Sequence, residues 1–170
     1  HGASGELEFR APSQLAEYFG NPEATRAAFT EDGFFRSGDL GYTTPDGRFV
    51  FQSRMGDVLR LSGFLVSPAE IEAVLAGHPA VDACQVVGVE REGQLKPFAF
   101  VTCKQGAGFD ETALIAYARE RIARYKVPVR VVALDAFPTV ESANAVKVQK
   151  ARLREWAQAL VAAEGAAQAS

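Results

Sequence analysis

The stretch "FRSGDLGYTTPDGRFVFQSRMGDVLRLSGF", residues 35–64, carries the most specific pattern in this chain. Its segment "TPDG", residues 44–47, is a turn signal between two runs of residues that favour strands. We therefore expect an antiparallel β-ribbon within residues 34–54. Asp39 stands near the start of this ribbon and Arg54 at its end, so the two side chains could close over one ligand.

The residues before the ribbon predict few elements. "GELEFR", residues 5–10, alternates like a strand, and residues 12–29 carry two short helical patterns that Gly20-Asn21-Pro22 separates. Asn21 is placed to cap the second helix, with Pro22 at its first position. Residues 1–53 hold strands without enough partners for a domain, so we interpret them as the end of a preceding domain.

The residues after Arg54 alternate between strand and helix patterns. Strands are expected at residues 57–64, 81–90, 95–104 and 129–134. Helices are expected at residues 67–79, from Asp110 until "YKVP", residues 125–128, ends the helix, and at residues 149–163. Ser67 and Glu70 form an S-x-x-E capping box at the first of these helices. This order predicts an α+β fold, in which helices pack on one face of a small mixed β-sheet.

The composition is that of a globular protein with a core, because 48% of the residues are hydrophobic and 23% are charged. A net charge of −3 gives no electrostatic support to a nucleic-acid partner. We expect neither a secretory signal nor a membrane span, which needs roughly 18 apolar residues in a row. Cys84 and Cys103 lie in apolar, strand-like runs, which favours two buried thiols over a metal site. We therefore expect a cytoplasmic protein.

The start of the sequence indicates a piece of a longer polypeptide. The chain begins with His1, and its only methionine is Met55. An initiator methionine is normally removed only before a small residue, which histidine is not. A function assigned to this chain is therefore expected to belong to a larger whole.

Three groups of residues could carry chemistry. A carboxylate such as that of Asp39 can accept two hydrogen bonds from a vicinal diol such as a ribose, although aspartates after glycine are also common turn residues. Lys147 follows the polar stretch "TVESANAV", which we expect to be a loop. Its ammonium could stabilise a developing oxyanion or phosphate, or could simply be solvated. In "LSGFLVSP", Gly63 either permits the close approach of a ligand or only completes a turn.

Six stretches, in this order, resemble the C-terminal part of the adenylate-forming enzymes, the superfamily of acyl- and aryl-CoA synthetases, peptide-synthetase adenylation domains and firefly-type luciferases. They are "GELEFRAPS", "NPEATRAAFTEDGFFRSGDLGY", "DGRFVFQSRMGDVLRLSGFLVSPAEIEAVLAGHPAV", "VVGV", "ARYKVP" and "FPT" with "KVQKARLRE". The resemblance implies that residues 1–53 end a large N-terminal adenylating domain. Residues 54–57 would form a hinge, and residues 58–170 a mobile C-terminal domain.

The resemblance also implies a role for each candidate residue. Asp39 and Arg54 match residues that bind the ribose hydroxyls of ATP and of the acyl-adenylate. Lys147 matches the lysine that enters the site when a carboxylate attacks the α-phosphate. Gly56 lies at the hinge, about which the small domain rotates after that step. The tunnel for the pantetheine arm would then be lined by Ser62, Gly63 and Phe64.

The implied substrates and cofactors are a carboxylic acid, ATP, which yields AMP, and coenzyme A, with Mg²⁺ bound by a preceding domain. The chain contains no Ser/Thr/Gly-rich phosphate loop and nothing that resembles the family's acyl pocket. We therefore expect its own N-terminal domain as a partner and expect the chain alone to be inactive. The leading hypothesis is part of an acyl-CoA synthetase. An adenylation domain that loads a carrier protein and a non-catalytic interaction module are the alternatives.

The sequence departs from the family pattern at three places. Gly56 stands where the family commonly has aspartate or lysine, and Phe64 stands where a second glycine is frequent, so the tunnel is expected to be narrower. The loop before the lysine is longer than in the family and contains an Asn144-Ala145 pair. The register of "KVQKARLRE" favours Lys147 as the catalytic lysine, with Lys150 as the alternative.

Overall fold

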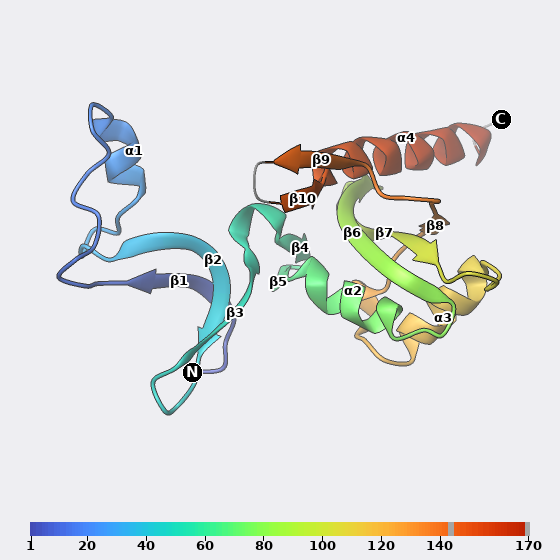
Figure 1. Cartoon of the computed structure of the whole chain (residues 1–170), viewed down its shortest axis with the longest axis horizontal. Coiled ribbons are helices and arrows are strands. Elements are labelled where there is room, and N and C mark those ends of the chain that lie inside the picture. Colours follow the sequence, from blue (N-terminus) through green and yellow to red (C-terminus); the bar gives the residue numbers. More distant parts are fainter. Residues whose placement is uncertain (143–144, 169–170) are drawn as a thin grey trace. The chain divides into compact units, whose positions relative to one another are not determined.

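The computed structural model describes residues 1–142 and 145–168 and divides the chain into two compact units, His1–Val58 (unit 1) and Leu59–Ser170 (unit 2) (Figure 1). The boundary follows the segment that we expect to act as a hinge, residues 54–57. Unit 1 contains β1 (Gly5–Phe9), α1 (Pro22–Ala27), β2 (Phe35–Thr43), β3 (Phe49–Arg54) and the 3₁₀ turn η1 (Met55–Asp57).

Unit 1 is built on an antiparallel sheet in the order β1-β2-β3, which confirms the expected ribbon. In the turn between β2 and β3, Thr44 N–H donates to Arg48 O at 2.8 Å. Gly47 in this turn has a φ of +81°, a conformation that favours glycine. The expected cap of α1 is also confirmed, because Ala24 N–H donates to Asn21 Oδ1 at 3.0 Å.

The first helix that we expected, within residues 12–19, is absent. Side chains bond to the backbone there in place of helical hydrogen bonds. Ala11 N–H donates to Gln14 Oε1 at 3.1 Å, and Tyr18 N–H donates to Thr25 Oγ1 at 2.9 Å. An isolated turn of helix is also unstable without an apolar face to bury, and Phe19 is 100% exposed.

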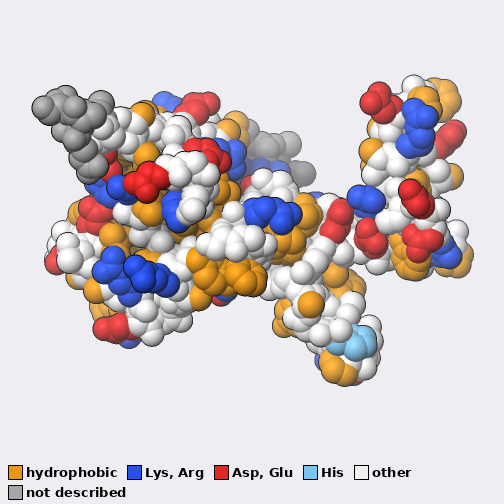
Figure 2. Space-filling view, turned by 180° about the vertical axis from the view of Figure 1, so that it is seen from behind, with side chains coloured by type: hydrophobic (Ala, Val, Ile, Leu, Met, Phe, Trp, Pro, Cys, Tyr) orange, Lys and Arg blue, Asp and Glu red, His pale blue; other side chains and the backbone are white. Residues whose placement is uncertain are grey.

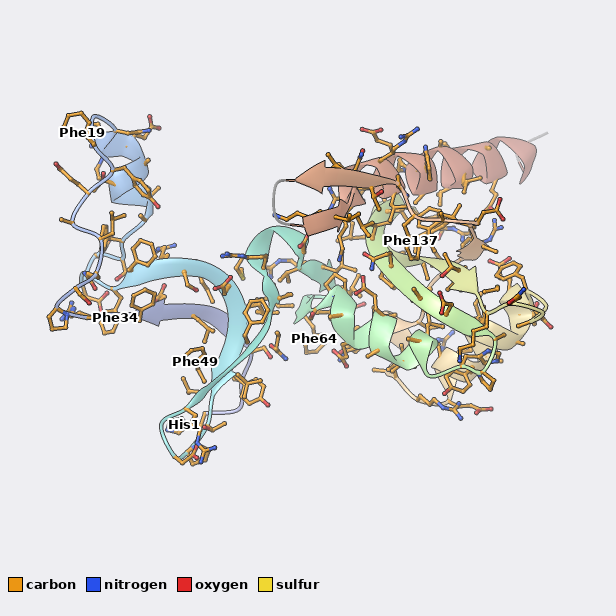
Figure 3. The ribbon with its side chains drawn as sticks, viewed as in Figure 1. His1, Phe19, Phe34, Phe49, Phe64 and Phe137 are labelled. Atoms are coloured by element: carbon orange, nitrogen blue, oxygen red, sulfur yellow. The ribbon has the colours of Figure 1, made fainter. Side chains whose placement is uncertain are left out.

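Unit 1 buries little of its own apolar surface. Leu40 is the one large hydrophobic side chain of this unit that is fully buried, whereas Phe49 is 70% exposed and Phe51 54% exposed. Figure 2 shows hydrophobic side chains at the surface of the unit, and Figure 3 labels Phe19 and Phe49 there (Figures 2 and 3). Exposed apolar surface of this kind is typical of a contact surface for further protein.

Unit 2 contains most of the helices and strands of the chain. They are β4 (Leu59–Leu61), β5 (Phe64–Val66), α2 (Pro68–Ala76), β6 (Val81–Arg91), β7 (Gln94–Cys103), α3 (Glu111–Arg119), the 3₁₀ turn η2 (Arg124–Lys126), β8 (Val131–Ala133), β9 (Thr139–Ser142), β10 (Ala145–Val148) and α4 (Lys150–Gln168). The central sheet has the order β6-β7-β8, in which β6 and β7 are antiparallel and β7 and β8 are parallel. The α+β fold with a small mixed sheet is therefore confirmed.

Helices cover both faces of this sheet, which corrects our expectation of one covered face. On one face Val86 and Val101 pack with Leu75 of α2 and with α3. On the other face Phe98 packs with Leu153 of α4, and Figure 1 shows α4 opposite α2 and α3. The near-continuous apolar runs of β6 and β7 are typical of strands that are buried on both faces.

A β-bulge adjusts which face the first residues of β6 take. The pairing of β6 with β7 shifts in register between Val81 and Ala83. Simple alternation would place Val81 and Cys84 on opposite faces, because they are three positions apart in the strand. Both lie in the cluster on the α2 side, since the bulge adds one residue to the strand.

Glutamate and glutamine side chains cap the edges of the sheet. On the edge strand β6, Val86 N–H donates to Glu72 Oε1 of α2 at 2.9 Å, and Glu90 N–H donates to Gln158 Oε1 of α4 at 3.0 Å. On the other edge strand, β8, Val131 N–H donates to Glu111 Oε1 of α3 at 2.9 Å. These bonds tie the helices to the sheet and block the addition of further strands at these positions.

Two short ribbons replace a strand and a loop that we expected. Residues 57–64 form β4 and a turn that leads into β5, because Ser62 and Gly63 both take positive φ. The expected loop at residues 139–146 contains β9 and part of β10, which pair in antiparallel fashion. Phe137 and Val148, at the base of this second ribbon, pack against the cluster under α4.

The helix caps follow the sequence in part. Ala113 N–H donates to Asp110 Oδ1 at 3.0 Å, which confirms the cap of α3. The capping box of α2 is wrong, because Ser67 makes no capping hydrogen bond through its side chain and Glu70 pairs with Lys126 Nζ at 2.6 Å. A charged partner competes for the carboxylate that the box would use. The last helix, α4, runs further than expected, to Gln168.

We predict that Phe98→Ala lowers the free energy of unfolding by about 3–5 kcal/mol, because the removal of a buried phenylalanine ring leaves a cavity. Phe98 is 0% exposed. Urea unfolding followed by the fluorescence of Trp156, the only tryptophan, measures the loss. Phe109→Ala is the control, since Phe109 is 43% exposed, and it should change stability by roughly 0.5 kcal/mol or less. Equal losses in the two variants would contradict the assigned core.

Candidate functional site

Asp39 and Arg54 meet across the β2–β3 ribbon of unit 1. They occupy directly opposed positions in the register of the two strands. Arg54 Nη1 lies 2.7 Å from Asp39 Oδ1, and the side chains are 68% and 24% exposed respectively. The structure therefore brings together the acid and the base that the sequence singles out.

The backbone at Asp39 is held by residues that sequence reasoning treated only as parts of strands. Ser37 Oγ donates to Leu7 O of β1 at 2.7 Å and accepts from Asp39 N–H at 3.1 Å. Gly38 N–H donates to Glu6 Oε1 at 3.2 Å. Gly38 has a φ of +69°, so a residue with a side chain would be strained there. Glu6 and Ser37 thus fix the direction in which the Asp39 carboxylate leaves the strand.

One carboxylate oxygen of Asp39 has an ion-pair partner but accepts no hydrogen bond. Asp39 Oδ1 is buried and accepts no hydrogen bond from the described residues. Arg54 Nη1 approaches it as an ion pair but donates its hydrogen bond to Ser37 O at 3.3 Å. A buried acceptor without a donor is unusual in folded proteins and suits a ligand hydroxyl group. The carboxylate beside an exposed guanidinium therefore fits a diol that carries nearby phosphate.

A hollow of about 280 Å³ in unit 1 lies beside this carboxylate. Asp39 and Ser37 line it, together with the apolar side chains of Leu7, Phe9 and Phe49. Such a mixture of a few polar groups with apolar walls is typical of small-molecule sites.

Gly56, the expected hinge residue, is exposed in the turn η1. Its φ is not in the positive range that requires glycine, and a Cβ atom built there meets nothing within 4 Å. A side chain could therefore be accommodated in this conformation.

The tunnel candidates Ser62, Gly63 and Phe64 form the tip of the β4–β5 ribbon in unit 2. Ser62 has a φ of +50° and Gly63 a φ of +87°, which makes a tight turn. Phe64 is 58% exposed, and its ring stacks on Tyr125 with centroids 5.1 Å apart. Tyr125, which lies in the quoted stretch "ARYKVP", is a neighbour of this turn that the sequence alone did not connect with it.

Lys147 lies on β10 of unit 2, opposite Val140, and is exposed. Within the described part of the chain it has no ion pair and no hydrogen bond through its ammonium group. Asn144, in the dipeptide Asn144-Ala145, lies outside the described residues. An unpaired ammonium on a strand has a more defined position than one on a loop, which corrects the expected loop setting.

Lys150, the alternative catalytic lysine, is already paired. Its Nζ lies 3.3 Å from Glu72 Oε1, and the two side chains are 28% and 17% exposed. The neighbouring Cys84 thiol has its pKa raised to about 12, mainly by burial and further by the Glu72 carboxylate, while Lys150 opposes the shift. Cys84 is therefore a neutral core thiol, as expected, whereas Cys103 is only half-buried.

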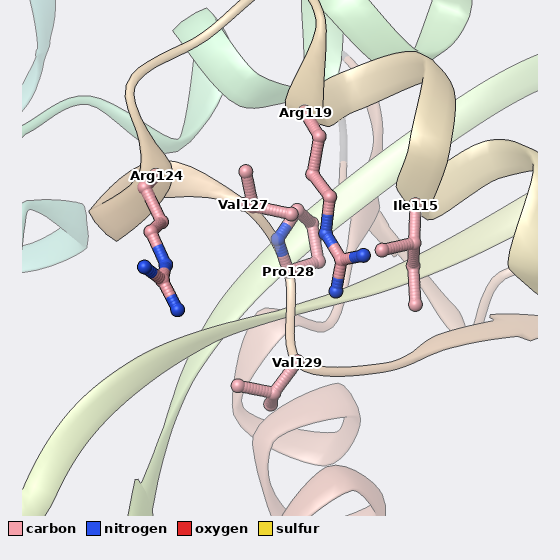
Figure 4. A pocket seen from close by; sticks show the side chains of 6 residues that line it. All are labelled: Ile115, Arg119, Arg124, Val127, Pro128 and Val129. Carbon is pink, nitrogen blue, oxygen red and sulfur yellow. The ribbon is translucent and has the colours of Figure 1, made fainter.

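A larger hollow, of about 630 Å³, opens in unit 2 between α3 and η2. Figure 4 shows two arginines, Arg119 and Arg124, at this hollow (Figure 4). The other lining residues are apolar: Ile115, Val127, Pro128 and Val129. A hollow with two cations and an apolar floor suits an anionic ligand with a flat or apolar part.

The two arginines of this hollow differ from the basic residues around them. Lys126, Arg121 and Arg130 each pair with a glutamate. In residues 1–142 and 145–168, neither Arg119 nor Arg124 has such a partner. Their charges are therefore free to meet an anion from outside the chain.

No group of three or more histidine, cysteine, aspartate or glutamate side chains among the described residues is arranged to hold a metal ion. Among the described residues, no helix is both long enough and apolar enough to cross a membrane. The candidate groups are one carboxylate and one arginine, Asp39 and Arg54, in unit 1. In unit 2 they are Lys147, Arg119 and Arg124.

Comparison with known proteins shows one consistent family. Residues 70–144 match the family described as the AMP-binding enzyme C-terminal domain. The chain is 44% identical over 137 residues to a 2-succinylbenzoate–CoA ligase of Geobacillus kaustophilus. The aligned region covers 79% of this chain and 28% of that protein. It is 38% identical over 157 residues to a benzoate–CoA ligase of Thauera aromatica, covering 90% and 29%.

Solved structures give the same result. The ATP-bound MatB from Rhodopseudomonas palustris matches with a TM-score of 0.82 and 31% identity, over 94% of this chain and 31% of that chain. The O-succinylbenzoate coenzyme A synthetase (MenE) from Bacillus subtilis, in complex with AMP, matches with a TM-score of 0.74 and 31% identity, over 90% and 30%. The chain thus spans about 30% of the length of the proteins that it matches.

Proposed function

Because the chain belongs to the adenylate-forming superfamily and is similar to part of several acyl-CoA ligases, we propose that the full-length protein is an ATP-dependent acyl-CoA synthetase. The observation that carries the proposal is the Asp39 carboxylate, which has a buried oxygen without a hydrogen bond beside an exposed arginine. Supply of ATP and coenzyme A would place the enzyme in the cytoplasm.

The proposed reaction has two steps. A carboxylate oxygen of the acid attacks the α-phosphorus of ATP, forms an acyl-adenylate and releases pyrophosphate. The sulfur of coenzyme A then attacks the acyl carbon, its proton passes to solvent, and AMP leaves with the electrons of the broken C–O bond. Electrostatic stabilisation of the charge that develops on the phosphate and carboxylate oxygens is the main demand on the protein in the first step.

Lys147 is proposed to meet this demand. Its ammonium is exposed and unpaired within the described chain, so it would lose no internal ion pair on approaching the substrate. Lys150 would have to break its pair with Glu72 first. We propose Lys147 as the catalytic lysine and Asp39 as the acceptor of hydrogen bonds from the ribose hydroxyls, with Arg54 beside it.

The second step is proposed to use other elements of unit 2. Residues 54–57, with Gly56, are proposed as the hinge about which the C-terminal domain, residues 58–170, rotates after the first step. The turn at Ser62, Gly63 and Phe64 would then line the path of the pantetheine arm. The stack of Phe64 on Tyr125 fills one side of that turn, in keeping with a narrower tunnel.

Coenzyme A is proposed as the thiol acceptor in preference to a carrier protein. Arg119 and Arg124 lack acidic partners in the described chain and flank an apolar hollow of about 630 Å³. That combination suits the phosphates and the adenine of a nucleotide. A carrier protein would offer a phosphopantetheine arm without the adenosine part.

The remainder of the N-terminal domain is proposed to cover the apolar surface of unit 1. Phe49 and Phe51 are exposed and the unit buries only one large apolar side chain. The phosphate loop, the acyl pocket and the ligands of Mg²⁺ would lie in that remainder, so we propose that residues 1–170 alone are inactive.

We predict that Asp39→Asn in the full-length protein raises the KM for ATP by roughly 10- to 100-fold, because a hydrogen bond to a charged group contributes about 1.5–3 kcal/mol. The wild-type enzyme should prefer ATP to 2′-deoxy-ATP, and the variant should lose much of this preference. Asp46→Asn, in the exposed turn of the same ribbon, is the control. A variant that keeps the full preference would contradict a ribose contact.

We predict that Lys147→Ala slows carboxylate-dependent pyrophosphate exchange by about 10²–10³-fold, the usual effect of removing one group that stabilises transition-state charge. Thioester formation from supplied acyl-adenylate should continue at close to the wild-type rate. Lys104→Ala, at an exposed position after β7, is the control. Unchanged exchange in Lys147→Ala would instead favour Lys150 as the catalytic lysine, whereas no exchange even by the wild-type protein would favour a non-catalytic interaction module.

We predict that Arg119→Gln and Arg124→Gln each raise the KM for coenzyme A by roughly 10-fold or more, since each loses a charge-assisted hydrogen bond to phosphate. Pyrophosphate exchange should not change. Arg121→Gln, whose guanidinium already pairs with Glu120 at 2.9 Å, is the matched control. If neither variant affects the KM, the hollow is not a coenzyme A site. If the wild-type enzyme forms no thioester with free coenzyme A, a carrier-protein acceptor gains support.

A further inference from the structure

The Glu72 carboxylate joins three elements of unit 2 through one oxygen. Glu72 belongs to α2, and its Oε1 accepts a hydrogen bond from Val86 N–H of β6 at 2.9 Å. The same oxygen lies 3.3 Å from Nζ of Lys150, the first residue of α4. The contact therefore runs around the β6 edge of the sheet, from the helix on one face to the helix on the other.

The β9–β10 ribbon, which carries Lys147 on β10, has its base next to this contact between Glu72 and Lys150. Gln149 N–H donates to Pro138 O at 2.8 Å, and Gln149 Nε2 donates to Thr139 O at 2.8 Å, so the two chains of the β9–β10 ribbon are closed at their base. Lys150 follows immediately and is held by Glu72. Lys147 thus stands three residues from an anchored position.

Apolar packing holds the other side of the ribbon base. Val148 packs against the cluster under α4, and strand alternation turns Lys147 to the opposite side of the ribbon from Val148. The half-buried Val148 and the paired Lys150 therefore hold the segment on either side of residue 149, while Lys147 stays exposed.

We propose that Glu72 and Lys150 are a positioning pair for Lys147 in the adenylate-forming step. This rests on the proposed function, in which Lys147 acts on the α-phosphate. Catalytic groups lose much of their effect when they are displaced by about 1 Å, which can cost roughly 10²-fold in rate. A charge pair at the start of α4 limits such displacement without placing either partner at the substrate.

The opposite edge of the sheet offers a matched control. Glu111 of α3 accepts from Val131 N–H of the edge strand β8 at 2.9 Å and pairs with Arg130 Nε at 2.7 Å. This is the same constellation as at Glu72: a helix glutamate, an edge N–H and a basic side chain. Glu111 bonds to none of the residues of the β9–β10 ribbon that the structure describes.

The test compares Glu72→Gln with Glu111→Gln in the full-length protein. The amide keeps an acceptor oxygen for the edge N–H and removes the charge that attracts the basic partner. We expect Glu72→Gln to slow pyrophosphate exchange by roughly 10- to 100-fold. Thioester formation from supplied acyl-adenylate should stay near the wild-type rate. Glu111→Gln should lower the Tm to a similar degree and change neither rate.

A second variant separates a paired role from two independent ones. If Glu72 acts through Lys150, the double variant Glu72→Gln/Lys150→Gln should slow exchange no more than the more severe single variant. The proposal is overturned if Glu72→Gln leaves exchange unchanged, or if it slows both steps equally, as a general loss of structure would. If Lys147→Ala itself exchanges at the wild-type rate, the assignment of Lys147 fails and the positioning role fails with it, while the proposed adenylation stands; if the wild-type protein shows no exchange, the proposed function fails.

Discussion

The antiparallel ladder between β6 and β7 is the constraint on which the rest of unit 2 depends. Both faces of these strands are buried, so the chain has to supply one helical layer for each face. The helices α2 and α3 form one layer and α4 forms the other. The backbone N–H and C=O groups at the two edges of this sheet have no neighbouring strand to bond with. Side chains of the helices accept hydrogen bonds from three of these N–H groups, at Val86, Glu90 and Val131.

The functional groups use this framework in two different ways. In unit 2, Lys147 extends from the β9–β10 ribbon, and the base of this ribbon packs against the core under α4. The core of unit 2 therefore determines where Lys147 lies. In unit 1, Asp39 depends on local contacts instead: Ser37 and Glu6 hold its backbone, and Arg54 faces it across the ribbon. The proposed movement of a domain that presents a lysine calls for the first arrangement, whereas the proposed nucleotide contact of Asp39 can be built with the second.

Sequence periodicity and turn chemistry predicted the ribbon of Asp39 and Arg54, because a Pro-Asp-Gly turn and opposed strand residues are local signals. The order of helices and strands led us to expect helices on one face of the sheet, whereas helices cover both. The unbroken apolar run "FAFV" in β7 could have indicated burial on both faces. The polar letters of "TVESANAV" concealed a ribbon, since exposed strands alternate too weakly to be told from a loop. The pairing of Glu72 with Lys150 had no signal in the sequence, because it is formed only when α2 and α4 meet around the sheet edge.

The central claim is that this chain serves an enzyme that activates carboxylic acids through an adenylate. The most direct test is the exchange of labelled pyrophosphate into ATP by the full-length protein, measured over a panel of aromatic and aliphatic carboxylic acids. We expect exchange that requires one class of acid and disappears when the acid is omitted. The absence of exchange with every acid, from folded protein that binds ATP, would contradict the central claim.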